Sequence, residues 1–95
     1  MSILTANFQV FGRVQGVFFR KYAKLEADKH RIYGWIRNTS KGTVEGYMEG
    51  QSDDIHSFKH WLSNVGTPNS RIDKVEFYNE KTADKNLYDG FIIKR

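Results

Sequence analysis

Residues 5–31 read TANFQVFGRVQGVFFRKYAKLEADKHR, and within them an alternating pattern gives way to a helical one. Within Thr5–Arg13, Phe8 and Val10 alternate with residues of the opposite face, which predicts a half-buried strand. The segment Phe19–Arg31 has no glycine or proline and is rich in Lys, Glu and Ala, so it predicts a helix. At ~100° per residue, its apolar face gathers Phe19, Tyr22, Ala23 and Ala27.

The residues after this helix predict a hairpin, a second helix and two further strands. Turn-forming residues 38–42 separate two strands and predict a hairpin. The later elements are strands Tyr33–Asn38 and Thr43–Gly50, a helix from Ser52 that ends at Gly66 and Pro68, and strands Arg71–Lys81 and Gly90–Lys94. The order β-α-β-β-α-β plus a short last strand predicts a single α+β domain over residues 1–95. We expect a ferredoxin-like sandwich, an antiparallel sheet with two helices on one face.

Two details of the helices are specific enough to test. Ser52 is the predicted N-cap of the second helix, whose apolar stripe is Ile55, Phe58, Leu62 and Val65. In the first helix Glu26 falls on the apolar face, where a carboxylate needs a partner or a wet pocket. We expect Glu26 to accept a hydrogen bond from a neighbouring hydroxyl or to lie at the edge of the sheet.

Composition narrows the classes of function. The 95 residues are 39% hydrophobic and 15% aromatic, enough for one domain with a core. The absence of cysteine excludes a disulfide framework, a cysteine-ligated metal and a thiol nucleophile, and fits a cytoplasmic location. No stretch approaches the ~20 apolar residues of a membrane span, and no signal peptide is evident. The net charge of +4 fits simple solubility, or a faster approach of anions.

The predicted topology brings two distant segments together. The first and second strands run in the same direction, because a helix returns the chain between them. Their ends therefore open at the same edge of the sheet, with one strand between. This arrangement places the loop after Arg13 roughly 10 Å from Asn38, a gap that a phosphate and a water can fill.

The loop after the first strand is typical of an anion-binding site. Gly12 and Gly16 let the backbone curl so that N–H groups converge, and the start of a helix adds unpaired N–H groups. Arg20 offers a planar, charged fork that can pair with two phosphate oxygens. Taken alone, the two glycines are at least as typical of a plain turn, with Arg20 as a surface residue. No Gly-Lys-Ser/Thr follows, which excludes a nucleotide P-loop.

One position in this loop limits the chemistry. Val14 precedes Arg20 by the interval that separates nucleophile and arginine in cysteine phosphatases. Valine cannot attack phosphorus. A similar cradle here would bind a phosphoryl group without forming a phosphocysteine, so the attack would come from water.

Two long motifs resemble the signatures of the acylphosphatases. Residues 12–20, GRVQGVFFR, resemble the first signature, and residues 34–46, GWIRNTSKGTVEG, resemble the second. The likeness continues at residues 61–62, 66–68, 70–72 and 79–81, so it covers essentially the whole chain. It implies a ferredoxin-like fold and the hydrolysis of acyl phosphates to carboxylate and inorganic phosphate.

The resemblance also implies roles for individual residues. Arg20 is expected to bind the phosphate and Asn38 to orient the attacking water. Gly12 and Thr39 are expected to support the site, Thr39 by fixing the Asn38 side chain. The phosphate is expected to contact mainly backbone N–H groups, those of Gln15, Gly16, Val17, Phe18 and Phe19.

The family uses neither metal nor organic cofactor. For this chain we expect no cofactor. We also expect a monomer that acts on a small-molecule acyl phosphate, with inorganic phosphate as a competitive inhibitor and no nucleic-acid or membrane partner. The acyl half of the substrate, the final proton acceptor and the roles of Glu26 and Arg95 stay open.

The main alternatives are non-catalytic. An RNA-recognition module shares the element order, but the third strand here contains Glu45 and Glu49, which would repel phosphates. A regulatory domain that has lost activity would not need Arg20 and Asn38, although Asn38 alone is typical of a turn. The sequence has three histidines: His30, His56 and His60. The last two lie one turn apart on the second helix, but no third ligand accompanies them, so the histidines do not suggest a metal site.

Overall fold

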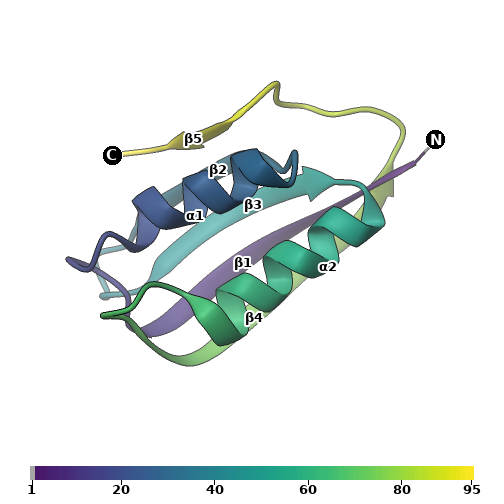
Figure 1. Cartoon of the computed structure of the whole chain (residues 1–95). Coiled ribbons are helices and arrows are strands. Elements are labelled where there is room, and N and C mark those ends of the chain that lie inside the picture. Colours follow the sequence, from purple (N-terminus) through teal and green to yellow (C-terminus); the bar gives the residue numbers. More distant parts are fainter. Residues whose placement is uncertain (1) are drawn as a thin grey trace.

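The computed structural model describes residues 2–95 and shows a five-stranded sheet with two helices on one face (Figure 1). In chain order the elements are β1 (Ile3–Arg13), α1 (Phe19–Lys29), β2 (Tyr33–Asn38), β3 (Val44–Gly50), α2 (Ser52–His60), the π-helical turn η1 (Trp61–Val65), β4 (Arg71–Ala83) and β5 (Phe91–Ile93). The strand order is β4-β1-β3-β2-β5. The predicted ferredoxin-like α+β fold is confirmed. Among residues 2–95, no helix combines the length and apolar character needed to span a membrane.

The sheet is mixed rather than wholly antiparallel as predicted. The first four strands pair antiparallel, but β5 pairs parallel to β2, with Gly34 opposite Phe91. The chain reaches this edge through residues 84–90, which cross from the end of β4 to the start of β5 (Figure 1). Because of this crossing, β5 runs in the direction of β2, and Arg95 follows it at the same edge as the end of β2.

The core lies between the sheet and the helices. Phe8 and Val10 of β1 are fully buried, as the alternation predicted, and Val44 and Met48 of β3 face the same interior. The ring of Phe8 meets that of Phe58 from α2 edge-on, with 6.1 Å between centroids. These contacts fix α2 over the middle of the sheet.

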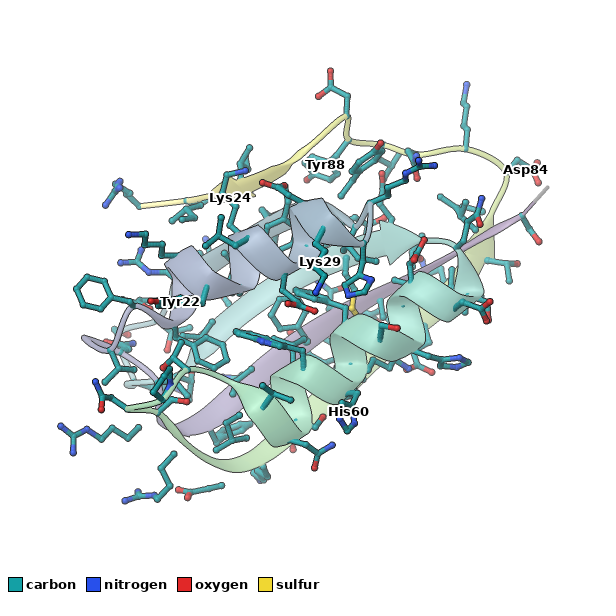
Figure 2. The ribbon with its side chains drawn as sticks, viewed as in Figure 1. Tyr22, Lys24, Lys29, His60, Asp84 and Tyr88 are labelled. Atoms are coloured by element: carbon teal, nitrogen blue, oxygen red, sulfur yellow. The ribbon has the colours of Figure 1, made fainter. Side chains whose placement is uncertain are left out.

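The first helix, α1, buries a narrower face than predicted. Phe19, Ala23 and Ala27 are buried, but Tyr22 is 45% exposed (Figure 2). The reason is geometric, because Tyr22 lies ~100° around the helix from Ala23. Glu26 is half-buried and pairs with the Nε2 of His30 at 2.9 Å, not with a hydroxyl or the sheet edge as expected.

The second helix differs from the prediction at both ends. Gln51, not Ser52, is the N-cap, and no side chain caps the helix. At the other end Val65 is 53% exposed and leaves the predicted stripe. There the N–H of Gly66 donates to the carbonyl of Trp61, five residues back. This π-helical turn is wider than an α-helical one and rotates Val65 away from the core.

The connections that matter for function gather at one end of the molecule. The loop before α1, the β2–β3 turn, the connection after η1 and the end of β5 all lie there (left in Figure 1). β1 and β2 run in the same direction with β3 between them. The predicted proximity of the loop after Arg13 to Asn38 follows from this arrangement.

At the opposite end, a buried carboxylate holds the crossing segment that leads to β5. Glu49 is fully buried and accepts hydrogen bonds from the Tyr47 hydroxyl at 2.8 Å and from the backbone N–H groups of Leu87 and Tyr88 at 3.0 and 2.9 Å. Burial, then the hydrogen bond and charge of Glu49, raise the pKa of Tyr47, so its hydroxyl stays a donor. Such donors let a carboxylate remain inside. They also fix the path of the chain toward β5 (Tyr88 in Figure 2).

Candidate active site

The loop between β1 and α1 has the backbone geometry of an anion-binding nest. Gly16 and Phe18 have φ of +74° and +60°, whereas Val17 between them has negative φ. Alternating handedness of this kind turns successive N–H groups toward one side. Within residues 2–95, no hydrogen bond is donated by the backbone N–H groups of residues 15–19. These donors are therefore free to bind a ligand.

Phe18 holds the most strained conformation in this loop. Its backbone is left-handed, which costs a bulky residue roughly 1–2 kcal/mol. Its ring is 70% exposed, so packing of the ring does not offset the cost. The buried side chains of Val14, Val17 and Phe19 hold the backbone on both sides. Backbone strain that the surroundings maintain in this way is concentrated at functional sites.

Helix α1 starts without a cap. Its N-cap residue, Phe18, gives no side-chain hydrogen bond, and its first turn has no acidic residue. Helix α2 differs, because Asp53 and Asp54 lie in its first turn. The partial positive charge at the start of α1 is therefore left uncompensated and favours a bound anion.

Two side chains tie the loop to its neighbours. The Gln15 Nε2 donates to the carbonyl oxygens of Thr39 and Thr43, both at 2.8 Å, and so links the loop to the β2–β3 turn. On the other side, the buried Thr67 hydroxyl donates to the carbonyl of Val17 at 3.1 Å. Sequence reasoning assigned only the backbone of Gln15 and missed this link. The two acceptors come together only once the hairpin has folded.

A cavity of about 290 Å³ opens beside the loop and is lined by Arg20 and Asn38, the two predicted catalytic residues. Gly16, Phe18 and Phe19 of the predicted loop also line it, whereas Gln15 and Val17 do not. The structure thus brings together residues from α1, β2 and the loop, as the topology indicated.

Arg20 enters the cavity from the first turn of α1. Its side chain is half-buried, and its Nη1 donates to the carbonyl of Lys94 at 3.4 Å. None of the ion pairs formed within residues 2–95 involves Arg20. A guanidinium has five N–H donors, so most of the fork stays available for an oxyanion.

Asn38 closes the cavity from the end of β2, where it pairs with Val44. Its Oδ1 is buried and has no hydrogen-bond partner within the described part of the chain. An unpaired buried acceptor costs about 1–3 kcal/mol, so native proteins rarely keep one without a reason. A ligand that supplies a donor to this amide would recover that energy.

Thr39 and Gly12 support the surrounding fold and do not line the cavity. The Thr39 hydroxyl pairs with that of Thr43 at 2.7 Å and accepts from the N–H of Lys41 at 3.2 Å. Within residues 2–95 no hydrogen bond joins the Thr39 hydroxyl to the Asn38 side chain, and the expected support of Asn38 by Thr39 stays a prediction. Gly12 has φ of +132°, and a Cβ there would meet the carbonyl oxygen of Arg71 at 2.0 Å. Glycine is needed at this position for the close approach of β1 and β4.

The cavity also contains residues that the sequence analysis did not assign. Lys21 lines it from α1, and Ile93 and Arg95 line it from β5 and beyond. No motif marked Ile93 or Arg95, because β5 reaches this edge only through the crossing at residues 84–90. The three histidines line a separate cavity between the helices, and within residues 2–95 no group of three or more His, Asp or Glu is arranged to hold a metal ion.

Known proteins with the same sequence pattern and shape support this description. The acylphosphatase family profile matches residues 6–93. The chain is 52% identical over 93 residues to acylphosphatase-2 of Homo sapiens, covering 98% of this chain and 94% of that protein. The crystal structure of acylphosphatase from Bacillus subtilis matches with a TM-score of 0.85 at 32% identity, covering 97% of this chain and 99% of that one.

A second bacterial structure agrees. An acylphosphatase from Coxiella burnetii matches with a TM-score of 0.84 at 29% identity, covering 97% of this chain and 93% of that one. The profile range includes the loop, Arg20 and Asn38, and it stops before Arg95. The expectation of a hydrolase that acts on acyl phosphates is confirmed. Because the match spans nearly the whole sequence, the chain belongs to the acylphosphatase family.

Proposed function

We propose that the protein hydrolyses acyl phosphates by direct attack of water on phosphorus, with Arg20 and the loop 15–19 holding the phosphoryl group and Asn38 orienting the water. The observation that supports this most strongly is the shared cavity. A nest of free N–H groups and a guanidinium without an acidic partner adjoin the same space as an unpaired amide.

The loop and Arg20 would neutralise the phosphoryl oxygens. Backbone donors fixed by Gln15 and Thr67 need little reorganisation when charge shifts during the reaction, which is the usual origin of electrostatic catalysis. Arg20 adds a positive charge and a planar fork of donors that matches two phosphoryl oxygens. Inorganic phosphate has the same oxygens, so it should compete with the substrate for this nest.

Asn38 would position the nucleophile. The new bond forms between the water oxygen and phosphorus, while the bond from phosphorus to the acyl oxygen breaks and the carboxylate leaves as a stable anion. The leaving group needs no acid. Placement of the water in line is therefore the main remaining requirement. The buried Oδ1 of Asn38 is an acceptor still in need of a donor, and rotation of the amide can present it to water.

The described lining of the cavity offers no side-chain base for the proton of the attacking water. No His, Asp or Glu is among the described residues that line the cavity. We propose that a phosphoryl oxygen of the substrate takes this proton. Val14 occupies the position of a covalent nucleophile and is buried and inert, so no phosphoenzyme is expected. We also propose that the monomer is the active form.

The test is hydrolysis of benzoyl phosphate in water enriched in ¹⁸O. We expect turnover that a chelator does not change, competitive inhibition by inorganic phosphate, and ¹⁸O recovered in phosphate. Label in benzoate would show attack at the acyl carbon and would contradict the proposed roles of Arg20 and Asn38. A labelled phosphoenzyme after a rapid quench would exclude direct attack by water.

A further inference from the structure

The candidate active site contains more positive charge than one phosphoryl group requires. Besides Arg20, the cavity is lined by Lys21 and Arg95, and both of these side chains are exposed. None of the ion pairs within residues 2–95 includes Lys21 or Arg95. Three cations thus share one cavity whose described lining contains no carboxylate side chain.

Lys21 and Arg95 line the cavity from different elements of the fold. Lys21 follows Arg20 in the first turn of α1, and consecutive helical residues point ~100° apart, so the two side chains do not approach one phosphate from the same direction. The Lys21 Nζ lies 5.9 Å from the centre of the exposed Phe18 ring, on the solvent side of the loop. Arg95 follows Lys94, whose carbonyl accepts from Arg20, and it approaches from the β5 side.

We propose that Lys21 and Arg95 bind a second anionic group, on the acyl half of the substrate. The preferred substrates are then acyl phosphates of acids that carry a further carboxylate or phosphate. This inference rests on the proposed function, which assigns the phosphoryl group to Arg20 and the loop. Neighbouring cations repel one another unless an anion lies between them, and a second substrate charge supplies that anion. An α-carboxylate on Arg95 would offset one charge and still leave Lys21 without an acidic partner.

The substrates that test this differ in one group. Benzoyl phosphate is compared with 3-carboxybenzoyl phosphate and with 3-(phosphonomethyl)benzoyl phosphate, whose meta substituents cannot reach the acyl carbon and assist hydrolysis. Each kcat/KM is divided by the rate of the spontaneous reaction. Partly exposed charge pairs of this kind change affinity by about two- to fivefold each. We therefore expect kcat/KM to be higher for the charged substrates by about fivefold or more, and the two charged arms show whether carboxylate or phosphate is preferred.

Matched variants locate the effect. Lys21→Met and Arg95→Met should each lower the preference for the charged substrates, and the double variant should bring the ratio close to one. Lys29→Met is the control, because Lys29 is an exposed lysine in the last turn of the same helix, ~12 Å along its axis, and does not line the cavity (Figure 2). An equal loss of preference in Lys29→Met would show a general field effect and overturn the inference, as would a wild-type ratio of one.

A binding measurement separates this inference from the proposed function. Titration calorimetry with phenylphosphonate and 3-carboxyphenylphosphonate needs no turnover. If benzoyl phosphate is not hydrolysed, the proposed function fails, but tighter binding of the carboxylated phosphonate that depends on Lys21 would still support the second anion site. If benzoyl phosphate is hydrolysed and the two phosphonates bind equally, only the inference fails.

Discussion

Gln15 offers a test of how the two halves of the site are held together. Its Nε2 makes two hydrogen bonds of 2.8 Å to carbonyl oxygens of the β2–β3 turn, which begins directly after Asn38. The substitution Gln15→Met keeps the length of the side chain and removes both donors. Each net hydrogen bond contributes about 0.5–1.5 kcal/mol, so we expect the free energy of unfolding to fall by about 1–3 kcal/mol.

The effect on catalysis should exceed the effect on phosphate binding. The nest keeps its own geometry through Thr67 and its buried side chains, but the turn is no longer held against it. A displacement of about 1 Å between reacting groups can cost about a hundredfold in rate. We therefore expect kcat to fall by about ten- to a hundredfold, with a much smaller rise in the inhibition constant of phosphate.

Gln9→Met is the matched control. The Gln9 Nε2 donates at 2.9 Å to the hydroxyl of Thr43, in the same turn, but has no bond to the loop. Urea unfolding should show a loss of about 1 kcal/mol for this variant, and its kcat should stay near that of the wild type. If Gln15→Met lost no more stability than Gln9→Met and kept its kcat, Gln15 would not position the turn, and the reasoning would be wrong.

Three further predictions concern backbone strain and the buried carboxylate. Arg31 has φ of +57° just after α1, so Arg31→Gly should raise the free energy of unfolding by about 0.5–1 kcal/mol, and a loss in thermal unfolding would contradict this. Phe18→Gly should likewise stabilise, whereas Phe18→Ala keeps the strain and should not; equal stability of the two variants would exclude strain at Phe18. Glu49→Gln replaces one of the two acceptor oxygens with a donor that faces a backbone N–H group, and it should cost about 2–4 kcal/mol in urea unfolding; a loss below about 0.5 kcal/mol would show that Glu49 does not anchor the crossing.

The parts of the fold that depend on local pattern could be predicted. Alternation at Phe8 and Val10 identified the buried face of β1, and the turn residues before Val44 identified the hairpin. The proximity of Asn38 to the loop followed from topology alone. The helix between β1 and β2 returns the chain, so the two strands run in the same direction with one strand between them.

The parts that depend on distant contacts could not be predicted. The parallel pairing of β5 could not be predicted, because the crossing before it is bound to Glu49 by the N–H groups of Leu87 and Tyr88, which are far from Glu49 in sequence. The role of the Gln15 side chain needed the folded hairpin. The short strand gave no sign that Arg95 would line the cavity.

The helices show the same limit at smaller scale. The apolar stripe of α2 predicted Ile55 and Phe58 correctly, since the α-helical period holds there. It failed at Val65 because the period widens in the π-helical turn, and no residue type in Trp61–Val65 marks that change. Residue patterns thus identify faces, while the deviations come from packing.

In the proposed mechanism, Arg20 and the loop hold the phosphate while Asn38 orients the water. Arg20→Gln should weaken both catalysis and phosphate binding. That result would support only the role of Arg20 in binding the phosphate. The more direct measurement is kcat and the phosphate inhibition constant of Asn38→Ala with benzoyl phosphate. We expect kcat to fall by about a hundredfold or more while the inhibition constant stays within about threefold of the wild type. An inhibition constant that rises as much as kcat falls would show that Asn38 binds phosphate and does not aim the water.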